Sequence, residues 1–192
     1  MELMESLETR RSIRKFQEGR AVPQEVVDKI LAAGRVASSA ANLQPLKYVV
    51  VRSPELVAQV FPLLRWAARL PAEQGVPKEG ERPVLYVATL VDRSVKSPFA
   101  DTDAGLALSN MTLAAWDEGV GSCILGSIDR AGLKELLGIG EDLDIHSVTA
   151  YGYPAISSRV VEPQDDDIGY YLDDAGNYCV PKRLLSETVR YL

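Results

Sequence analysis

A group of cations near the N-terminus is the first feature of the sequence that could do chemistry. The segment ETRRSIRKF, residues 8–16, carries the four cations Arg10, Arg11, Arg14 and Lys15, and the hydroxyl of Ser12 lies among them. In an extended backbone, Arg10, Ser12 and Arg14 would lie on one side, which places two guanidinium groups and a hydroxyl in line, while Ile13 or Phe16 can anchor the segment in the core. Such a set suits a small anion such as a phosphate group. The alternative is that the cations only complement the dipole of a preceding helix.

The composition limits the kind of anion that this segment could meet. A pI of about 4.9 and a formal charge of −6 argue against a general affinity for nucleic acid or anionic membranes, because binding to polyanions depends on many lysines and arginines. A local basic cluster in an acidic chain therefore indicates one small anion rather than a polymer. We expect no nucleic-acid partner and no membrane partner.

A second set of polar groups follows in SSAANLQP, residues 38–45. Ser38 and Ser39 are among the small residues that would let another backbone or a flat ring come close, and Asn42 and Gln44 supply amide donors and acceptors. The alternative is a helix C-terminus and loop that binds nothing.

Other chemistries have little support in the sequence. His146, the only histidine, falls in a predicted strand, where a hydrogen-bonded core or edge histidine is the expected role, and no GxSxG motif accompanies it. One histidine and two distant cysteines make a poor zinc site. The run Asp165-Asp166-Asp167 lacks EF-hand spacing and is interpreted as a solvated acidic loop, so no metal site is predicted. An enzyme with this sequence would therefore need a bound cofactor.

The same features indicate a compartment. Cys123 and Cys179 are far apart without a CxxC motif, which is typical of reduced thiols in a reducing environment. The N-terminus is acidic and has no apolar signal region. The longest uncharged stretch with helical character, residues 104–116, is shorter than the roughly 20 residues of a membrane span. We expect a soluble, cytoplasmic protein.

Periodicity predicts the elements that would position these groups. Helices are expected over residues 2–9, from Pro23 to about 38, over 54–70 with a break at Pro62, through 104–119 with Asp101 or Thr102 as the cap, and over 130–137 between Asp129 and Gly138. Strands are expected over residues 46–53, 84–91, 121–126 and 145–154. The segment 71–83 is expected to be a surface loop.

Strands that alternate with helices often form a parallel sheet, but the phosphate-binding motifs of such folds are missing. The prediction is therefore a single α+β domain over residues 1–192 with a mixed central sheet flanked by helices. Residues 160–192 form an acidic, turn-rich tail with too little apolar periodicity to fold alone. This tail must therefore pack against another surface.

Three segments together resemble a known family. RRSIRKF (10–16), SSAANLQP (38–45) and PKRLLSETV (181–189) are similar to the three flavin-contacting segments of the FMN-dependent nitroreductases, and the spacing of the first two also matches. The intervening segments 81–92, 103–128 and 170–183 resemble family segments in the same order. The resemblance therefore covers nearly the whole chain.

The resemblance implies FMN as cofactor and a homodimer with two flavins at its interface, over which the C-terminal arm extends. Arg10, Ser12, Lys182 and Arg183 would hold phosphate or ribityl, Arg14 would approach the N1/O2 edge of the ring, and Leu125 and Gly126 would meet the N5 region. Residues 38–45 would come from the partner subunit. The implied flavin contacts are Arg10, Arg11, Ser12, Arg14, Ser38, Ser39, Asn42, Gln44, Leu125, Gly126, Lys182 and Arg183, although Arg11 could instead face solvent or pair with an acid.

The implied activity is transfer of hydride from NADH or NADPH to flavin N5 and then to a small electron acceptor, a nitroaromatic or a quinone, by a ping-pong mechanism. Relatives with other substrates, such as enone reductases, flavin reductases and dehalogenases, stay open as alternatives. So do an FMN-binding redox sensor or carrier and an anion-binding module without flavin. Leu46 stands where many relatives carry an aromatic residue, and Ala40 and Ala41 replace common hydroxyl residues, which bears on the substrate range.

Overall fold

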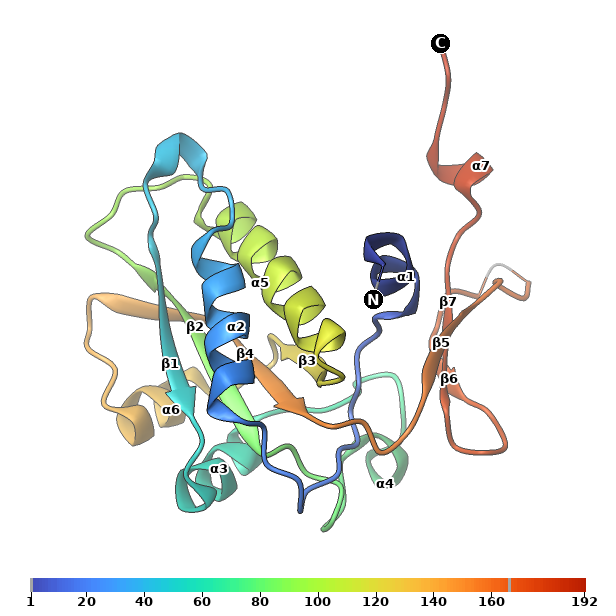
Figure 1. Ribbon diagram of the computed structural model, residues 1–192, viewed down its shortest axis with the longest axis horizontal. Coiled ribbons are helices and arrows are strands. Elements are labelled where there is room, and N and C mark those ends of the chain that lie inside the picture. The colour runs from blue at the N-terminus through green and yellow to red at the C-terminus, as the bar shows by residue number, and fades with distance from the viewer. Residues whose placement is uncertain (1, 166) are drawn as a thin grey trace.

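The computed structural model describes residues 2–165 and 167–192 (Figure 1). Its α-helices are α1 (Leu3–Thr9), α2 (Gln24–Arg35), α3 (Pro54–Val60), α4 (Ala72–Gly75), α5 (Ala100–Asp117), α6 (Arg130–Leu137) and α7 (Leu185–Thr188), with short 3₁₀ turns at Ala40–Asn42 and Phe61–Leu63. Its strands are β1 (Leu46–Val51), β2 (Leu85–Asp92), β3 (Gly121–Leu125), β4 (Leu143–Gly152), β5 (Ser158–Val161), β6 (Tyr171–Leu172) and β7 (Tyr178–Pro181).

The central sheet has four strands in the order β1-β2-β4-β3, and all three neighbouring pairs are antiparallel. The N-terminal segment joins the β3 edge through a parallel bridge between Ser12 and Ser122, and this bridge gives the sheet its mixed character. The prediction of an α+β fold rather than a parallel α/β fold is confirmed.

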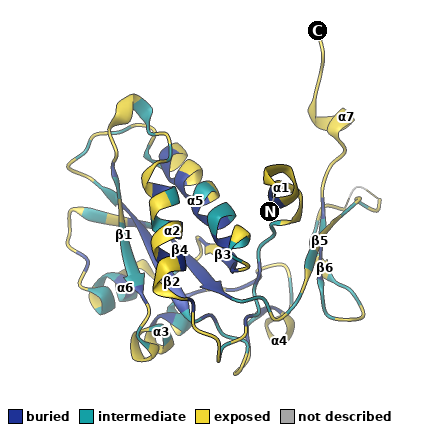
Figure 2. Ribbon diagram, in the orientation of Figure 1, coloured by how far each residue is buried: buried dark blue, intermediate teal, exposed yellow. Residues whose placement is uncertain are grey.

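The central strand β2 alternates its side chains between two layers of helices. Leu85 and Val87 pack with α2 and α5, whereas Tyr86, Ala88 and Leu90 pack in the cluster that contains α3 and α6. Figure 2 shows the resulting buried band along β2 and β4. The sheet therefore forms the middle layer between two groups of helices.

Local signals set the helix ends where the sequence predicts them. Helix α2 begins directly after Pro23, and helix α6 begins after Asp129, whose carboxylate accepts a hydrogen bond from Gly132 N at 3.0 Å. Gly138 ends α6 with a φ of 62°, a conformation that favours glycine. His146 lies in the predicted strand β4, between β2 and β3, with Nδ1 3.0 Å from the hydroxyl of Ser147, as expected for a hydrogen-bonded histidine.

Three local predictions differ from the structure. Residues 64–70 are not helical, because Pro62 ends the helical segment and Leu64 instead forms a bridge with Ile128. Neither Asp101 nor Thr102 caps α5, since the helix already begins at Ala100 and no side chain caps it. The predicted surface loop 71–83 is also interrupted by the short helix α4.

The tail contains order that the sequence pattern did not reveal. Strands β5, β7 and β6 form a small sheet of their own, in which Tyr178 and Cys179 are fully buried. Beyond Pro181 the chain leaves this sheet, and α7 and the C-terminus extend away from the rest of the molecule (Figure 1). In the acidic run, Asp167 accepts a hydrogen bond from Gly169 N at 2.7 Å, whereas Asp166 lies outside the described residues.

Within residues 2–165 and 167–192, no helix is both long enough and apolar enough to cross a membrane. The same residues contain no group of histidine, cysteine, aspartate or glutamate side chains that could hold a metal ion. Cys123 and Cys179 are buried free thiols.

Candidate functional site

The basic segment, residues 10–16, is fixed to the protein body at its middle and at its end. Ile13 and Phe16 are fully buried, and Ile13 N donates to Ser122 O at 2.8 Å while Phe16 N donates to Glu81 O at 2.8 Å. Glycines make this close approach possible, because a Cβ at Gly121 would lie 2.8 Å from Ile13 and one at Gly152 would lie 3.0 Å from Phe16. The prediction that Ile13 or Phe16 anchors the segment in the core is confirmed for both residues.

Two adjacent guanidinium groups lie at the start of this segment. Burial lowers the pKa of Arg10, and burial together with the nearby charge of Arg10 lowers the pKa of Arg11. Arg11 donates to the carbonyl oxygens of Leu7 and Glu8 in the last turn of α1, which is the helix-end role considered for these cations. Ion pairs among the described residues include neither arginine. The pair is therefore a partly buried positive centre that an anion would stabilise.

Arg14 connects the basic segment to the small C-terminal sheet. Its guanidinium carbon lies 4.6 Å from the ring centroid of Tyr170 and 5.0 Å from that of Tyr178. Burial raises the pKa of the Cys123 thiol, and the charge and a hydrogen bond of Arg14 act against this rise. Stacking uses the face of a guanidinium and leaves the N–H groups in its plane. Arg14 can therefore still offer a ligand N–H groups at its edge.

The 38–44 loop is held by a buried carboxylate that the sequence prediction missed. Asp103 of α5 is 2% exposed and accepts hydrogen bonds from Ser39 Oγ at 2.6 Å and from Ala40 N at 3.0 Å. Ser39 Oγ in turn accepts from Gln44 N at 2.9 Å. The only sequence signal for this contact is that Asp103 is an acid in a helix that is otherwise apolar nearly all round.

The backbone of this loop is strained. Ala41, Asn42 and Gln44 have φ values of 50°, 54° and 52°, in the left-handed region that residues other than glycine rarely adopt. Conformations of this kind are retained only where the surrounding structure imposes them, and they are common at functional sites. The Asp103 hydrogen bonds supply that constraint here.

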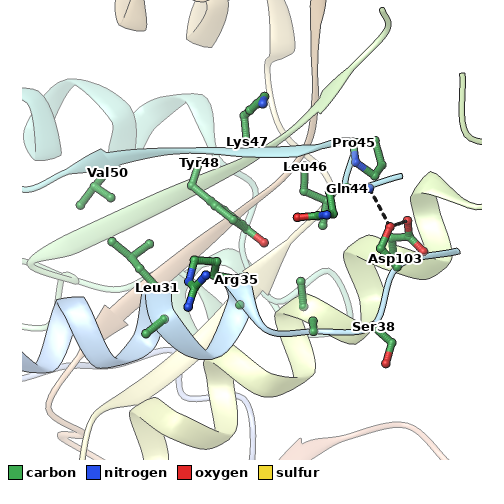
Figure 3. Close-up of a pocket in the computed structure, with 15 residues that line it drawn as sticks. Leu31, Arg35, Ser38, Gln44, Pro45, Leu46, Lys47, Tyr48, Val50 and Asp103 are labelled. Carbon is green, nitrogen blue, oxygen red and sulfur yellow. Dashed lines mark hydrogen bonds between the residues drawn. The ribbon is translucent and has the colours of Figure 1, made fainter. Parts of the chain in front are cut away.

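A groove of about 530 Å³ lies beside the loop, between α2, β1 and α5 (Figure 3). Ser38, Ser39 and Gln44 line one end, and Arg35, Lys47 and Tyr48 line the other. Burial raises the pKa of the Tyr48 phenol, so this group is a hydrogen-bond donor at neutral pH. The groove therefore combines amide, hydroxyl and cationic groups that come from α2, the 38–44 loop and β1. Asn42 is exposed on the loop but does not line the groove.

The remaining predicted contacts lie at the end of β3 and in the segment that follows β7. Leu125 is buried at the end of β3, and Gly126 follows it in the open, where an added Cβ would meet nothing within 4 Å. Lys182 and Arg183 follow β7 and are exposed. In the described part of the chain, no hydrogen bond or ion pair joins these two cations to Arg10 or Ser12.

One chain does not bring the basic segment and the 38–44 loop together. Asp103, under the loop, lies near the start of α5, whereas Trp116 at the end of α5 donates to Thr9 Oγ1 at 2.9 Å beside the basic segment. At 1.5 Å per residue, these two points are about 20 Å apart along the helix. Figure 1 shows the loop and α1 near opposite ends of α5. The predicted contacts therefore form two half-sites.

Comparison with known proteins places the chain in a family. Residues 7–153 match the Nitroreductase family. Two archaeal proteins that carry the name "Putative NADH dehydrogenase/NAD(P)H nitroreductase" are similar to the chain. The one from Methanothermobacter thermautotrophicus is 33% identical over 81% of this chain and 78% of its own length, and the one from Archaeoglobus fulgidus is 32% identical over 85% and 92%.

The fold agrees with solved structures. An FMN-dependent nitroreductase from Clostridium difficile R20291 superposes with a TM-score of 0.72 at 20% identity, and the match covers 98% of each chain. The chain belongs to the nitroreductase family, as the sequence resemblance indicates.

Proposed function

We propose that the protein is an oxidoreductase that binds FMN and uses NADH or NADPH as the electron donor. Family membership supports this assignment, as do the names of relatives, which include an NADPH-dependent oxidoreductase of Staphylococcus haemolyticus that is 29% identical over 82% of this chain. A structural neighbour from Desulfovibrio desulfuricans, 24% identical with a TM-score of 0.72 over 98% of this chain and 95% of its own, was solved in complex with FMN.

The observation that carries the proposal is the partly buried positive centre at Arg10 and Arg11. FMN ends in a phosphate with close to two negative charges, and charge-assisted hydrogen bonds from guanidinium and hydroxyl groups are well matched to it. Arg10 and Ser12 would hold this phosphate, with Lys182 and Arg183 adding charge from the start of the arm. Arg11 would act mainly through its charge, because its N–H groups already donate to the α1 carbonyls.

We infer that a second copy of the chain completes the site. The 38–44 loop, with Ser38, Ser39, Asn42 and Gln44, would meet the flavin bound by the partner, since its own basic segment is about 20 Å away along α5. The exposed arm beyond Pro181 would lie across the partner. A homodimer with two equivalent flavins follows from this arrangement.

When bound, FMN would supply the hydride chemistry, accepting hydride from the nicotinamide and passing electrons to a nitroaromatic or quinone. The N–H edge of Arg14 would stabilise negative charge at the N1/O2 edge of the ring. The open backbone at Gly126 would leave room at the N5 region. The groove beside Tyr48 and Gln44 would shape access for donor and acceptor.

Purified protein tests this function directly. We expect a yellow protein whose flavin absorbance bleaches on anaerobic addition of NADH or NADPH and recovers when a quinone or nitroaromatic is added. A colourless protein that cannot be reconstituted with FMN would favour an anion-binding module. A yellow protein that neither nicotinamide reduces would favour a redox sensor or carrier.

Steady-state kinetics test the order of the reaction. If donor and acceptor use the same face of one flavin, each must leave before the other enters, so double-reciprocal plots at several fixed nicotinamide concentrations should be parallel. Each substrate in excess should also inhibit turnover, because it occupies the pocket while the flavin is in the wrong redox state. Converging lines would mean that both bind together and would contradict the ping-pong mechanism.

A further inference from the structure

Two tyrosines of the C-terminal segment enclose the guanidinium group of Arg14 on adjacent sides. The guanidinium carbon lies 4.6 Å from the ring centroid of Tyr170 and 5.0 Å from that of Tyr178. The two centroids are 6.1 Å apart, and the ring planes meet at 52°. This separation is much smaller than it would be for rings on opposite sides of the cation. The two rings therefore form a corner in which Arg14 lies.

Arg14 keeps its charge available in this corner. Its neighbour Lys15 pairs with Glu81 at 3.4 Å, whereas no carboxylate in the described part of the chain pairs with Arg14. Arg14 is half-buried, so part of it stays open to a ligand. The corner thus holds the cation through aromatic rings and without a counter-charge.

Both rings are fixed by contacts of their own. Tyr178 is fully buried in the small sheet, where β7 pairs with β5 and with β6. Tyr170 is half-buried just before β6, and its hydroxyl accepts a hydrogen bond from Arg69 N at 3.3 Å. The corner is therefore part of a folded element, and it can order the long, flexible side chain of an arginine.

An ordered cation beside apolar rings acts more strongly on a nearby charge. A group that is already in place stabilises negative charge without reorganising when that charge appears. Rings on two sides also exclude water, and the attraction between two charges grows as the surrounding medium becomes less polar. At the N1/O2 edge of a flavin, both effects favour the reduced form, which carries negative charge at N1. They have little effect on the neutral oxidised form.

We propose that Tyr170 and Tyr178 are positioning residues that raise the reduction potential of the bound flavin through Arg14. The inference rests on the proposed function, because it needs FMN with Arg14 at the N1/O2 edge. It adds a role for the small C-terminal sheet in the redox chemistry. The alternative is that the contact only holds this sheet against the body of the protein, in which case it affects stability alone.

Redox titration of the FMN-loaded variant Tyr170→Leu against a reference dye tests the inference. We expect reduced flavin to bind about tenfold more weakly, as for the loss of a shielded cation–aromatic contact, while binding of oxidised flavin hardly changes. This ratio lowers the two-electron midpoint potential by about 30 mV. Tyr170→Phe keeps the ring, loses only the bond from Arg69 N, and should retain the wild-type potential.

Tyr153→Leu is the matched control. The guanidinium carbon of Arg20 lies 3.3 Å from the ring centroid of Tyr153, which is half-buried like Tyr170. This variant removes a similar contact from a cation that is not among the proposed flavin contacts, so the potential should not change. Urea denaturation shows that each variant is folded. If Tyr170→Leu does not fold, Tyr170→Met removes the ring with less loss of volume and carries the same expectation.

A double variant separates positioning from packing. In an Arg14→Gln background, Tyr170→Leu should not shift the potential further, because no cation remains to be positioned, whereas an effect of packing alone would persist. The inference is overturned by an unchanged potential in a folded Tyr170→Leu protein, by an equal shift in Tyr170→Phe or Tyr153→Leu, or by additive shifts in the double variant. These results leave the proposed function intact. A wild type that binds no FMN would overturn both.

Discussion

The two half-sites hold their polar groups in different ways. The basic segment is anchored by two buried side chains, Ile13 and Phe16, its cations are half-buried, and none of its residues has a positive φ. The 38–44 loop has no buried side chain before Pro45 and keeps three residues at positive φ through one buried carboxylate, that of Asp103. Packing of buried side chains can hold a segment in place and still leave its surface side chains free to adjust. Hydrogen bonds from the backbone and Ser39 to a buried carboxylate instead define the backbone conformation of the loop.

This difference suggests a division of work between the halves. A phosphate with two charges needs positive groups nearby but tolerates small changes in their placement. A flat ring needs a backbone at a defined distance, and strain that is held in place supplies such a surface. We therefore expect substitutions in the basic segment to act on flavin affinity, and substitutions around Asp103 to act on loop order and through it on the ring.

The largest effect is expected from removal of residues 184–192. Leu184, Leu185 and Tyr191 are 49%, 72% and 90% exposed in one chain, so their loss should hardly change the stability of the monomer. If the arm covers a partner, the deletion should abolish the dimer and, with it, flavin binding. Analytical ultracentrifugation and flavin absorbance measure both. A truncated protein that stays dimeric and yellow would refute an interface held by the arm, and a yellow monomer would refute a site shared between subunits.

The next largest effect is expected for Arg10→Ala. A hydrogen bond to a charged group contributes about 1.5–3 kcal/mol, so FMN affinity should fall at least about tenfold. Fluorescence titration of flavin-free protein with FMN measures this change. Arg93→Ala is the control, because Arg93 pairs with Asp144 at 3.6 Å on the surface, in the turn after β2. Equal affinities for the two variants would remove Arg10 from the phosphate site.

The substitution Asp103→Asn tests how the 38–44 loop is held. The amide keeps the shape of the carboxylate, but its NH₂ group would face Ser39 Oγ, which already accepts from Gln44 N. We expect a loss of about 1–3 kcal/mol in the free energy of unfolding. Flavin binding should also weaken in the dimer. Urea denaturation of Asp103→Asn and of Asp101→Asn gives a matched comparison, since the Asp101 side chain is 95% exposed two residues earlier in the same helix. Similar midpoints for the two variants would contradict the role of Asp103.

The sequence predicted features that depend on neighbouring residues and missed contacts between residues far apart in the chain. The ends of α6 followed from Asp129 and Gly138 because capping and a positive-φ stop are local effects. The anchors Ile13 and Phe16 followed from their apolar character beside the cations. The Asp103 bonds join residues 63 and 64 positions apart, and the bridge of Leu64 joins it to Ile128, so no local pattern contains either contact. Strands β5, β6 and β7 have two to four residues each, too few for a period of two to stand out.

The smallest effect, Ala41→Gly, measures the strain in the loop. Ala41 has a φ of 50°, and the left-handed conformation costs an alanine about 1–2 kcal/mol relative to glycine. Glycine also raises the entropy of the unfolded chain, which opposes the gain by about 0.4–1 kcal/mol. The net expectation is a protein more stable by about 0.5 kcal/mol, measured by urea denaturation. Ala40→Gly is the control, since Ala40 is outside the positive-φ residues and its N–H still reaches Asp103, so glycine there should only destabilise. If both variants lose stability equally, Ala41 is not strained, and the loop holds its shape without the constraint assigned to Asp103.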